Sequence, residues 1–252
     1  MDTYPRYLRQ GFTAFDPLEL ARRTEEIVAR GDARKYTAFY CTGVYGGIST
    51  GYTVGCCLRC IFCWVDFSRD FPETHGEFYT PEQVVRRLIE NARRKRVDRL
   101  RISGGEPTLC KRHLLAVLER IEPTGYGFIL ETNGIPIGAP GGEEYAADLA
   151  RYTCAHIRVS LKAGTAEGFE ARTGARGEFW ELPFVAIERL LAAGADFHVA
   201  AMTDARLMSQ TERAALLARL RRAGYRGWME EEWCDAYRST VKRLRAAGWD
   251  LF

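Results

Sequence analysis

The feature that most constrains the fold is a regular alternation of two kinds of segment. From Ile48 to the end of the 252-residue chain, short β-branched or apolar runs alternate with longer amphipathic ones. The short runs are typical of strands in a buried sheet, and the longer runs have the apolar spacing of helices. Such alternation predicts βαβ units and a parallel sheet. The expected strands cover residues 49–54, 98–102, 126–131, 155–161, 196–202 and 225–229.

Capping signals mark several of the expected helices. Residues 80–83 (Thr-Pro-Glu-Gln) form a capping box with proline at the first helical position, and apolar residues follow at helical spacing. A first helix is expected to begin at Asp16 and to end at Gly31. The remaining expected helices cover residues 111–121, 143–151, 179–193, 209–222 and 234–247.

The length and composition favour one globular domain with a short extension. A chain of 252 residues is long enough to bury a full core, so we expect residues 48–252 to form one α/β domain and residues 1–47 an N-terminal extension. The chain is 46% hydrophobic and 27% charged with a formal net charge of +3. The charge therefore does not imply a nucleic-acid partner, and the basic run at 93–96 is expected to be a helix end rather than an RNA-binding patch. No stretch approaches the ~20 apolar residues of a membrane span, so a cytoplasmic protein is expected.

Three cysteines directly follow the first expected strand. Eight cysteines in a cytoplasmic protein indicate metal or redox chemistry rather than disulfides. Cys56, Cys60 and Cys63 supply three soft ligands, which suit an iron–sulfur cluster or zinc. A structural zinc site needs a fourth ligand, and no second cysteine or histidine pair follows at the usual spacing. A ferredoxin-like cysteine pattern beginning at Cys57 would need a further cysteine at the position of Phe67, and that cysteine is missing.

Three cysteine ligands would leave one iron of a four-iron cluster open to a substrate. The spacing Cys-x3-Cys-x-aromatic-Cys, with Phe62 in the aromatic place, resembles the signature of the radical S-adenosylmethionine (SAM) superfamily. The resemblance implies a partial (β/α)6 TIM barrel, a [4Fe-4S] cluster held by Cys56, Cys60 and Cys63, and SAM chelated by the open iron. It also implies that Phe62 lies against the adenine. The alternative is a zinc loop completed by a distant ligand.

The next motif follows the second expected strand. Ligands of parallel α/β sheets bind at the C-terminal ends of the strands. Two glycines there allow the backbone to approach a ligand closely. Gly104, Gly105, Glu106 and Pro107 resemble the Gly-Gly-Glu-Pro motif of the superfamily. The resemblance implies that this motif binds the methionyl amino group of SAM.

Later strand ends carry further candidates for the SAM pocket. Thr132 and Asn133 precede a glycine, which is first of all a turn signal, and they resemble a Thr-Asn-Gly segment of the glycyl-radical-enzyme activating branch. Ser160 and Lys162 resemble an Asp-x-Lys segment of that branch, with serine in the place of aspartate. The resemblance implies that Lys162 pairs with the SAM carboxylate. Met202, which closes the fifth expected strand, is a weaker candidate, because methionine there is more often core.

The resemblance also implies the reaction. A reduced flavodoxin or ferredoxin would supply an electron, and cleavage of SAM would give a 5′-deoxyadenosyl radical that abstracts hydrogen from a substrate. The match to the activating branch suggests a protein glycine as that substrate, and the glycine-rich segment 164–177 is expected to be a mobile recognition loop. A radical SAM enzyme acting on a small molecule or RNA, and a non-catalytic iron–sulfur or zinc protein, are the alternatives.

Overall fold

The computed structural model describes residues 4–252 and is built around one sheet. Within those residues the strand order is β1-β2-β3-β5-β6-β7-β8-β9, with β4 paired to β2. From β3 to β9 along this path every pair is parallel, whereas β1, β2 and β4 pair antiparallel. The strands are β1 (Ala29–Arg30), β2 (Ala33–Thr42), β3 (Ile48–Thr53), β4 (Glu77–Tyr79), β5 (Arg99–Gly104), β6 (Gly127–Thr132), β7 (Ala155–Leu161), β8 (Phe197–Met202) and β9 (Met229–Glu232).

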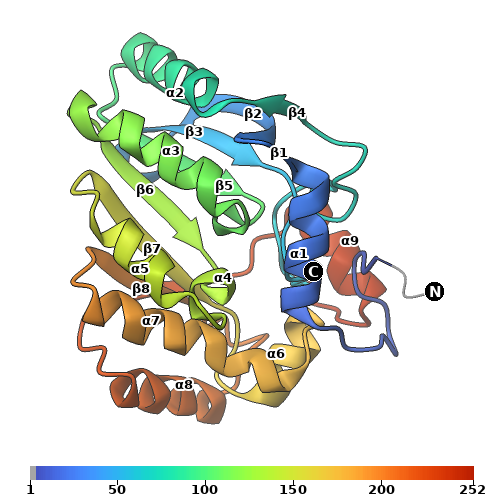
Figure 1. Ribbon diagram of the computed structural model, residues 1–252. Coiled ribbons are helices and arrows are strands. Elements are labelled where there is room, and N and C mark those ends of the chain that lie inside the picture. The colour runs from blue at the N-terminus through green and yellow to red at the C-terminus, as the bar shows by residue number, and fades with distance from the viewer. Residues whose placement is uncertain (1–3) are drawn as a thin grey trace.

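Helices cover one face of this sheet (Figure 1). Apolar residues of α2, α3, α5, α7 and α8 form the main core with the outward-facing residues of the parallel strands. The other face is left as the inside of an open half-barrel, which confirms the predicted partial (β/α)6 barrel. The helices are α1 (Pro17–Val28), α2 (Pro81–Lys95), α3 (Lys111–Ile121), α4 (Ile135–Gly138), α5 (Glu143–Ala150), α6 (Ala166–Thr173), α7 (Leu182–Ala192), α8 (Gln210–Arg222) and α9 (Arg238–Ala246).

Most element predictions are confirmed to within two or three residues, and their capping signals act as expected. Asp16 caps α1, and Thr80 with Gln83 forms the capping box of α2. The basic run at 93–96 is the last turn and C-cap of α2. Among residues 4–252, no helix is both long and apolar enough to cross a membrane.

The last strand and the last helix lie later in the chain than predicted. β9 begins where the predicted strand 225–229 ends, and α9 begins four residues after the predicted start of the helix 234–247. The reason is pairing with β8, which joins Val199 to Met229 and Met202 to Glu232. Tyr225 instead closes the preceding turn, because its hydroxyl donates to the carbonyl of Trp228 and accepts from the N–H of Val199.

Part of the predicted N-terminal extension belongs to the sheet. The strand β2 was not predicted, yet it pairs antiparallel with β3 from Thr42 opposite Ile48 to Tyr36 opposite Thr53. The parallel half-barrel therefore begins at β3, with β2 covering its first edge. This arrangement places the side chains of β2 next to the strand ends where the site was predicted.

The prediction of a mobile loop at 164–177 is wrong, because this segment contains α6. The backbone N–H groups of Arg59 and Ile61 each donate to a carbonyl at the end of α6, at 2.9 Å, so the helix backs the cysteine loop. Glycine is needed here for close packing rather than for mobility. A Cβ on Gly164 would lie 2.3 Å from the carbonyl oxygen of Glu212.

Candidate cluster and cofactor site

The three predicted ligands lie in the loop that follows β3. Cys60 is buried, and Cys56 and Cys63 are half-buried. Burial raises the pKa of Cys60 to about 12; the ammonium of Lys162 lowers this pKa, and the neighbouring Cys63 and Cys56 raise it. These four side chains are thus close enough to act on one another electrostatically. The structure brings the lysine at the end of β7 to the cysteine loop, as the sequence predicted.

Cys56 and Cys57 differ in their surroundings. The amide nitrogen of Asn133 lies 3.4 Å from the sulfur of Cys57 and 3.7 Å from that of Cys56. A hydrogen bond from Cys57 lowers the pKa of Cys56, whereas burial raises the pKa of Cys57 well above its usual range. A metal ligand must be a thiolate. That Cys56 rather than Cys57 is the iron ligand stays a prediction.

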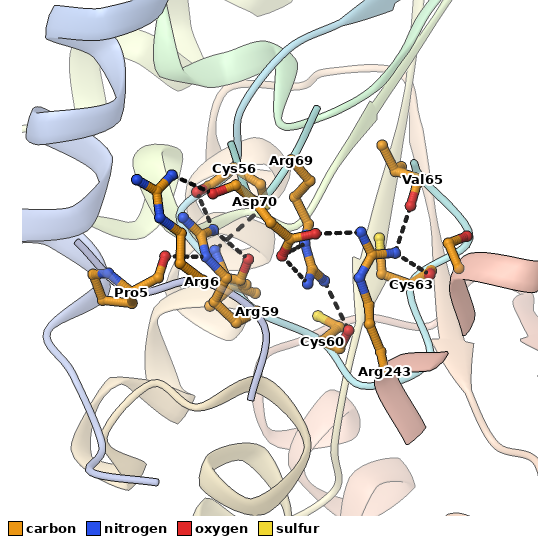
Figure 2. Close-up of polar contacts among 12 residues, drawn as sticks. Pro5, Arg6, Cys56, Arg59, Cys60, Cys63, Val65, Arg69, Asp70 and Arg243 are labelled. Carbon is orange, nitrogen blue, oxygen red and sulfur yellow. Dashed lines mark hydrogen bonds and ion pairs between the residues drawn. The ribbon is translucent and has the colours of Figure 1, made fainter. Parts of the chain in front are cut away.

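Arginines bind the backbone of the cysteine loop (Figure 2). Each carbonyl of the three predicted ligands accepts a hydrogen bond of 2.7 Å from a guanidinium group: Cys56 from Arg59, Cys60 from Arg69 and Cys63 from Arg243. These arginines were not among the predicted site residues. Arg243 in particular comes from α9, which no local pattern connects with the cysteines.

The residues around the loop fit an anionic cluster. Three buried guanidinium groups accompany one carboxylate: Asp70 pairs with Arg69 and Arg243, whereas Arg59 donates to backbone carbonyls. The buried donors Arg59 Nη2 and Arg243 Nε have no acceptor in residues 4–252. A thiolate-bound cluster would supply negative charge to match this excess. In residues 4–252, no three His, Cys, Asp or Glu side chains are arranged to hold a single metal ion. A cluster does not need that arrangement, because each thiolate binds its own iron.

The predicted glycine motif lies directly against the cysteine loop. Gly104 has a φ of +93°, and the N–H groups of Gly105 and Glu106 donate to the carbonyls of Thr53 and Gly55, at 2.8 Å each. A Cβ on Gly105 would lie 2.0 Å from the carbonyl oxygen of Gly55. Glycine at 105 is therefore required for the two loops to meet.

The carboxylate of Glu106 connects two strand ends. It is 2% exposed, and Oε1 accepts from the N–H and hydroxyl of Thr108, at 3.1 and 2.7 Å, and from the hydroxyl of Thr132, at 2.8 Å. Oε2 accepts from the N–H of Asn133 at 2.7 Å. The structure thus brings the predicted residues of two motifs together. That Glu106 also accepts from the SAM amino group stays a prediction.

An arginine of β2 holds the same loop from the other side. Arg34 is buried and donates to the carbonyl of Glu106, at 2.6 Å, and to that of Pro107. The sequence analysis missed Arg34 because it did not predict β2. Its role could not be read from local sequence, since its partners lie more than 70 residues away.

Ser160 and Lys162 lie beside a carboxylate that the sequence analysis also missed. The ammonium of Lys162 donates to Ser160 Oγ at 2.5 Å, and Ser160 Oγ donates to Glu232 at 2.8 Å. Burial raises the pKa of Glu232, but Lys162 and Arg158 outweigh it, so this pKa is lowered. A glutamate of β9 thus lies next to Ser160, the serine that replaces the aspartate of the resembled segment.

Two predicted residues are apolar neighbours of the cysteine loop. Phe62 is 8% exposed and Met202 is 6% exposed. Both belong to the apolar cluster that includes Cys57 and Cys60. Their packing agrees with a position beside the site, and their contact with adenine stays a prediction.

The inner face of the half-barrel is lined by ion pairs between buried arginines and half-buried glutamates. Arg101 of β5 pairs with Glu131 of β6 at 2.9 Å. Arg158 of β7 pairs with Glu230 and Glu232 of β9, at 2.8 and 3.0 Å. This polar lining could have been found from the alternation in the sequence, because polar or charged residues occupy every second position of β5 and β7.

A comparison with protein families matches residues 51–205 to the radical SAM superfamily. Among curated proteins, a probable GTP 3′,8-cyclase of Thermococcus kodakarensis is 30% identical over 125 residues, covering 50% of this chain and 38% of the relative. A probable GTP 3′,8-cyclase of Thermoplasma volcanium is 31% identical over 120 residues, covering 47% of this chain and 33% of the relative. The chain thus spans about a third of the length of these relatives.

Solved structures share the fold at low identity. Streptococcus suis SuiB bound to S-adenosylmethionine has a TM-score of 0.56 at 16% identity, and the match covers 73% of this chain and 40% of that one. TYW1 with a lysine-pyruvate adduct bound has a TM-score of 0.59 at 14% identity, covering 94% and 90%. The family match spans the cysteine loop, the glycine motif and the lysine of β7. This chain therefore belongs to the radical SAM superfamily, whose enzymes use a [4Fe-4S] cluster and SAM.

Proposed function

We propose that this radical SAM enzyme acts on a polar small molecule bound against the inner face of the half-barrel. The observation that carries the proposal is the set of ion pairs on that face, Arg101 with Glu131 and Arg158 with Glu230 and Glu232. The arginines are buried and the glutamates are half-buried. Charged side chains that line an open concave face offer both donors and acceptors to a polar ligand.

The chain's own residues would position both molecules. When bound, the cluster and SAM supply a 5′-deoxyadenosyl radical, and the proposed ligands are Cys56, Cys60 and Cys63. Lys162, beside Cys60, would hold the SAM carboxylate, and Glu106 would order the loop that binds its amino group. The arginines and glutamates of the inner face would orient the substrate and exclude competing reactions.

Two further observations support a small molecule over a protein glycine. The segment 164–177, expected to recognise a protein, packs as α6 against the cysteine loop instead. The curated relatives are named for acting on GTP, a small molecule. Since the chain spans only about a third of those relatives, GTP itself is not assigned here.

The test uses anaerobically reconstituted enzyme with SAM and a reductant. It is incubated with protein-free and protein-containing fractions of a lysate of the source cells, and 5′-deoxyadenosine is measured. We expect the protein-free fraction to stimulate its formation. Arg158→Met should abolish the stimulation but not the slow cleavage without substrate, whereas Arg221→Met, at an exposed position of α8, should change neither. Stimulation by the protein fraction alone would favour the protein glycine and refute the proposal.

The electron donor is the second proposed partner. Enzymes of this family need a reductant, and we expect a flavodoxin or ferredoxin to supply the electron. Replacing the chemical reductant with a reduced flavodoxin or ferredoxin should support SAM cleavage by the reconstituted enzyme. No cleavage with either protein would contradict this expectation.

A further inference from the structure

Two segments far apart in the sequence meet behind the cysteine loop. Arg69 and Asp70 follow the cysteines, whereas Arg243 comes from α9 (Figure 2). Asp70 Oδ1 accepts from Arg69 at 3.0 and 2.5 Å, and Asp70 Oδ2 accepts from Arg243. All three residues are no more than 1% exposed. With Arg59, they form what we call the arginine frame.

The frame holds the backbone of the loop at several points. Besides the carbonyls of the three predicted ligands, Arg243 also binds the carbonyls of Val65 and Asp66. Two other side chains of the same helix add contacts, because Thr240 donates to the carbonyl of Cys63 at 3.2 Å and Ser239 to that of Trp64 at 2.8 Å. Helix α9 is therefore fastened to the loop by most of one face.

The charges of the frame are not balanced within the protein. Asp70 pairs with both Arg69 and Arg243, and the buried Arg59 donates to backbone carbonyls, so three buried cations accompany one carboxylate. Burying cations without matching anions is costly. If the cluster of charges were purely structural, one cation would be enough to neutralise Asp70. The excess positive charge is explained if an anionic group lies next to the frame.

We infer that the arginine frame positions the three cysteines for the [4Fe-4S] cluster and raises the reduction potential of that cluster. Reduction adds negative charge, so a nearby excess of positive charge stabilises the reduced form. Residues around a metal site that orient its ligands also tune it. Helix α9 would then be part of the cluster site, although Arg243 lies outside the segment 51–205 that matches the family.

The test compares substitutions on one helix in the full, anaerobically reconstituted chain. The variants are Arg243→Met, which removes charge and hydrogen bonds, and Arg243→Lys, which keeps the charge but cannot reach every carbonyl. The control is Arg245→Met, because Arg245 is exposed on the same helix and donates only to the carbonyl of Phe252 among the described contacts. Circular dichroism establishes that each variant is folded.

The readouts are iron loss to a chelator, the electron paramagnetic resonance spectrum and the midpoint potential, none of which involves a substrate. We expect Arg243→Met to lose iron about tenfold faster, roughly the effect of one charge-assisted hydrogen bond, with a changed spectrum and a more negative potential. Arg243→Lys should also lose iron faster but keep a potential near that of the unmodified chain. The control should match the unmodified chain.

Unchanged iron loss, spectrum and potential in folded Arg243→Met would overturn the inference. If Arg243→Met does not fold, Arg243→Lys decides, and iron retention and a spectrum equal to those of the unmodified chain would overturn it. Because no readout uses a substrate, either result leaves the proposed small-molecule function untouched.

Discussion

Glu106→Gln tests whether one carboxylate joins the glycine motif to the end of β6. The four hydrogen bonds that Glu106 accepts come from both sides of its carboxylate. A glutamine has only one oxygen, so its NH2 group must face a donor. The least costly orientation breaks the bond from Asn133, and an unpaired buried N–H costs about 1–3 kcal/mol.

The other three hydrogen bonds would change from charge-assisted to neutral, a loss of roughly 1 kcal/mol each. Burying a neutral amide instead of a carboxylate recovers part of this sum. We expect the free energy of unfolding to fall by about 3 kcal/mol and the affinity for SAM to fall with it. The cluster absorbance should remain, because no iron ligand is changed.

The assay is urea unfolding followed by circular dichroism, with SAM binding measured on reconstituted protein. Glu90→Gln, at an exposed position of α2, is the matched control, and surface substitutions of this kind are usually within about 0.5 kcal/mol. A Glu106→Gln variant as stable as this control would refute the assigned hydrogen bonds. Unchanged SAM affinity would remove Glu106 from the cofactor site.

Three further changes have defined outcomes. Cys57→Ala should keep the cluster and Cys56→Ala should lose it, as iron content will show; the reverse result would place the ligand at Cys57. Lys162→Met should slow SAM cleavage by at least about tenfold, the effect of one charge-assisted bond of roughly 1.5–3 kcal/mol, and full activity would make Lys162 structural. Burial lowers the pKa of His113 from 6.5 to about 4. As the pH falls, this histidine is therefore protonated in the unfolded chain before it is protonated in the folded chain. Stability should therefore fall by about 3 kcal/mol as the pH drops from about 6.5 to about 4. His113→Asn should remove this dependence, and an unchanged pH slope in unfolding experiments would contradict it.

The elements that sequence patterns predicted well are those whose signals are local. The capping box at Thr80 and the alternation of strands and helices depend on neighbouring residues, so they could be recognised without a fold. β2 and β9 were missed or displaced because they carry charged residues that are stabilised by distant partners. Arg34, for example, is buried in β2 only because carbonyls of the glycine motif accept its hydrogen bonds.

The glycine-rich segment 164–177 shows a different limit. Glycines indicate mobility when nothing packs against them, and close contact when something does. Gly164 lies against the backbone of α8, so its contacts depend on a helix that begins more than 40 residues later. Sequence alone could not decide between these two roles.

By itself the sequence determined the chemistry of the site, because three cysteines within eight residues and a Gly-Gly-Glu-Pro turn are fixed by covalent spacing. Only the tertiary structure decided how these parts are held. It selected Arg34, Arg69 and Arg243 from an arginine-rich chain, and it brought Glu232 to Lys162. The physical reason is that a buried carbonyl or charge needs a partner, and which partner reaches it depends on how distant segments pack.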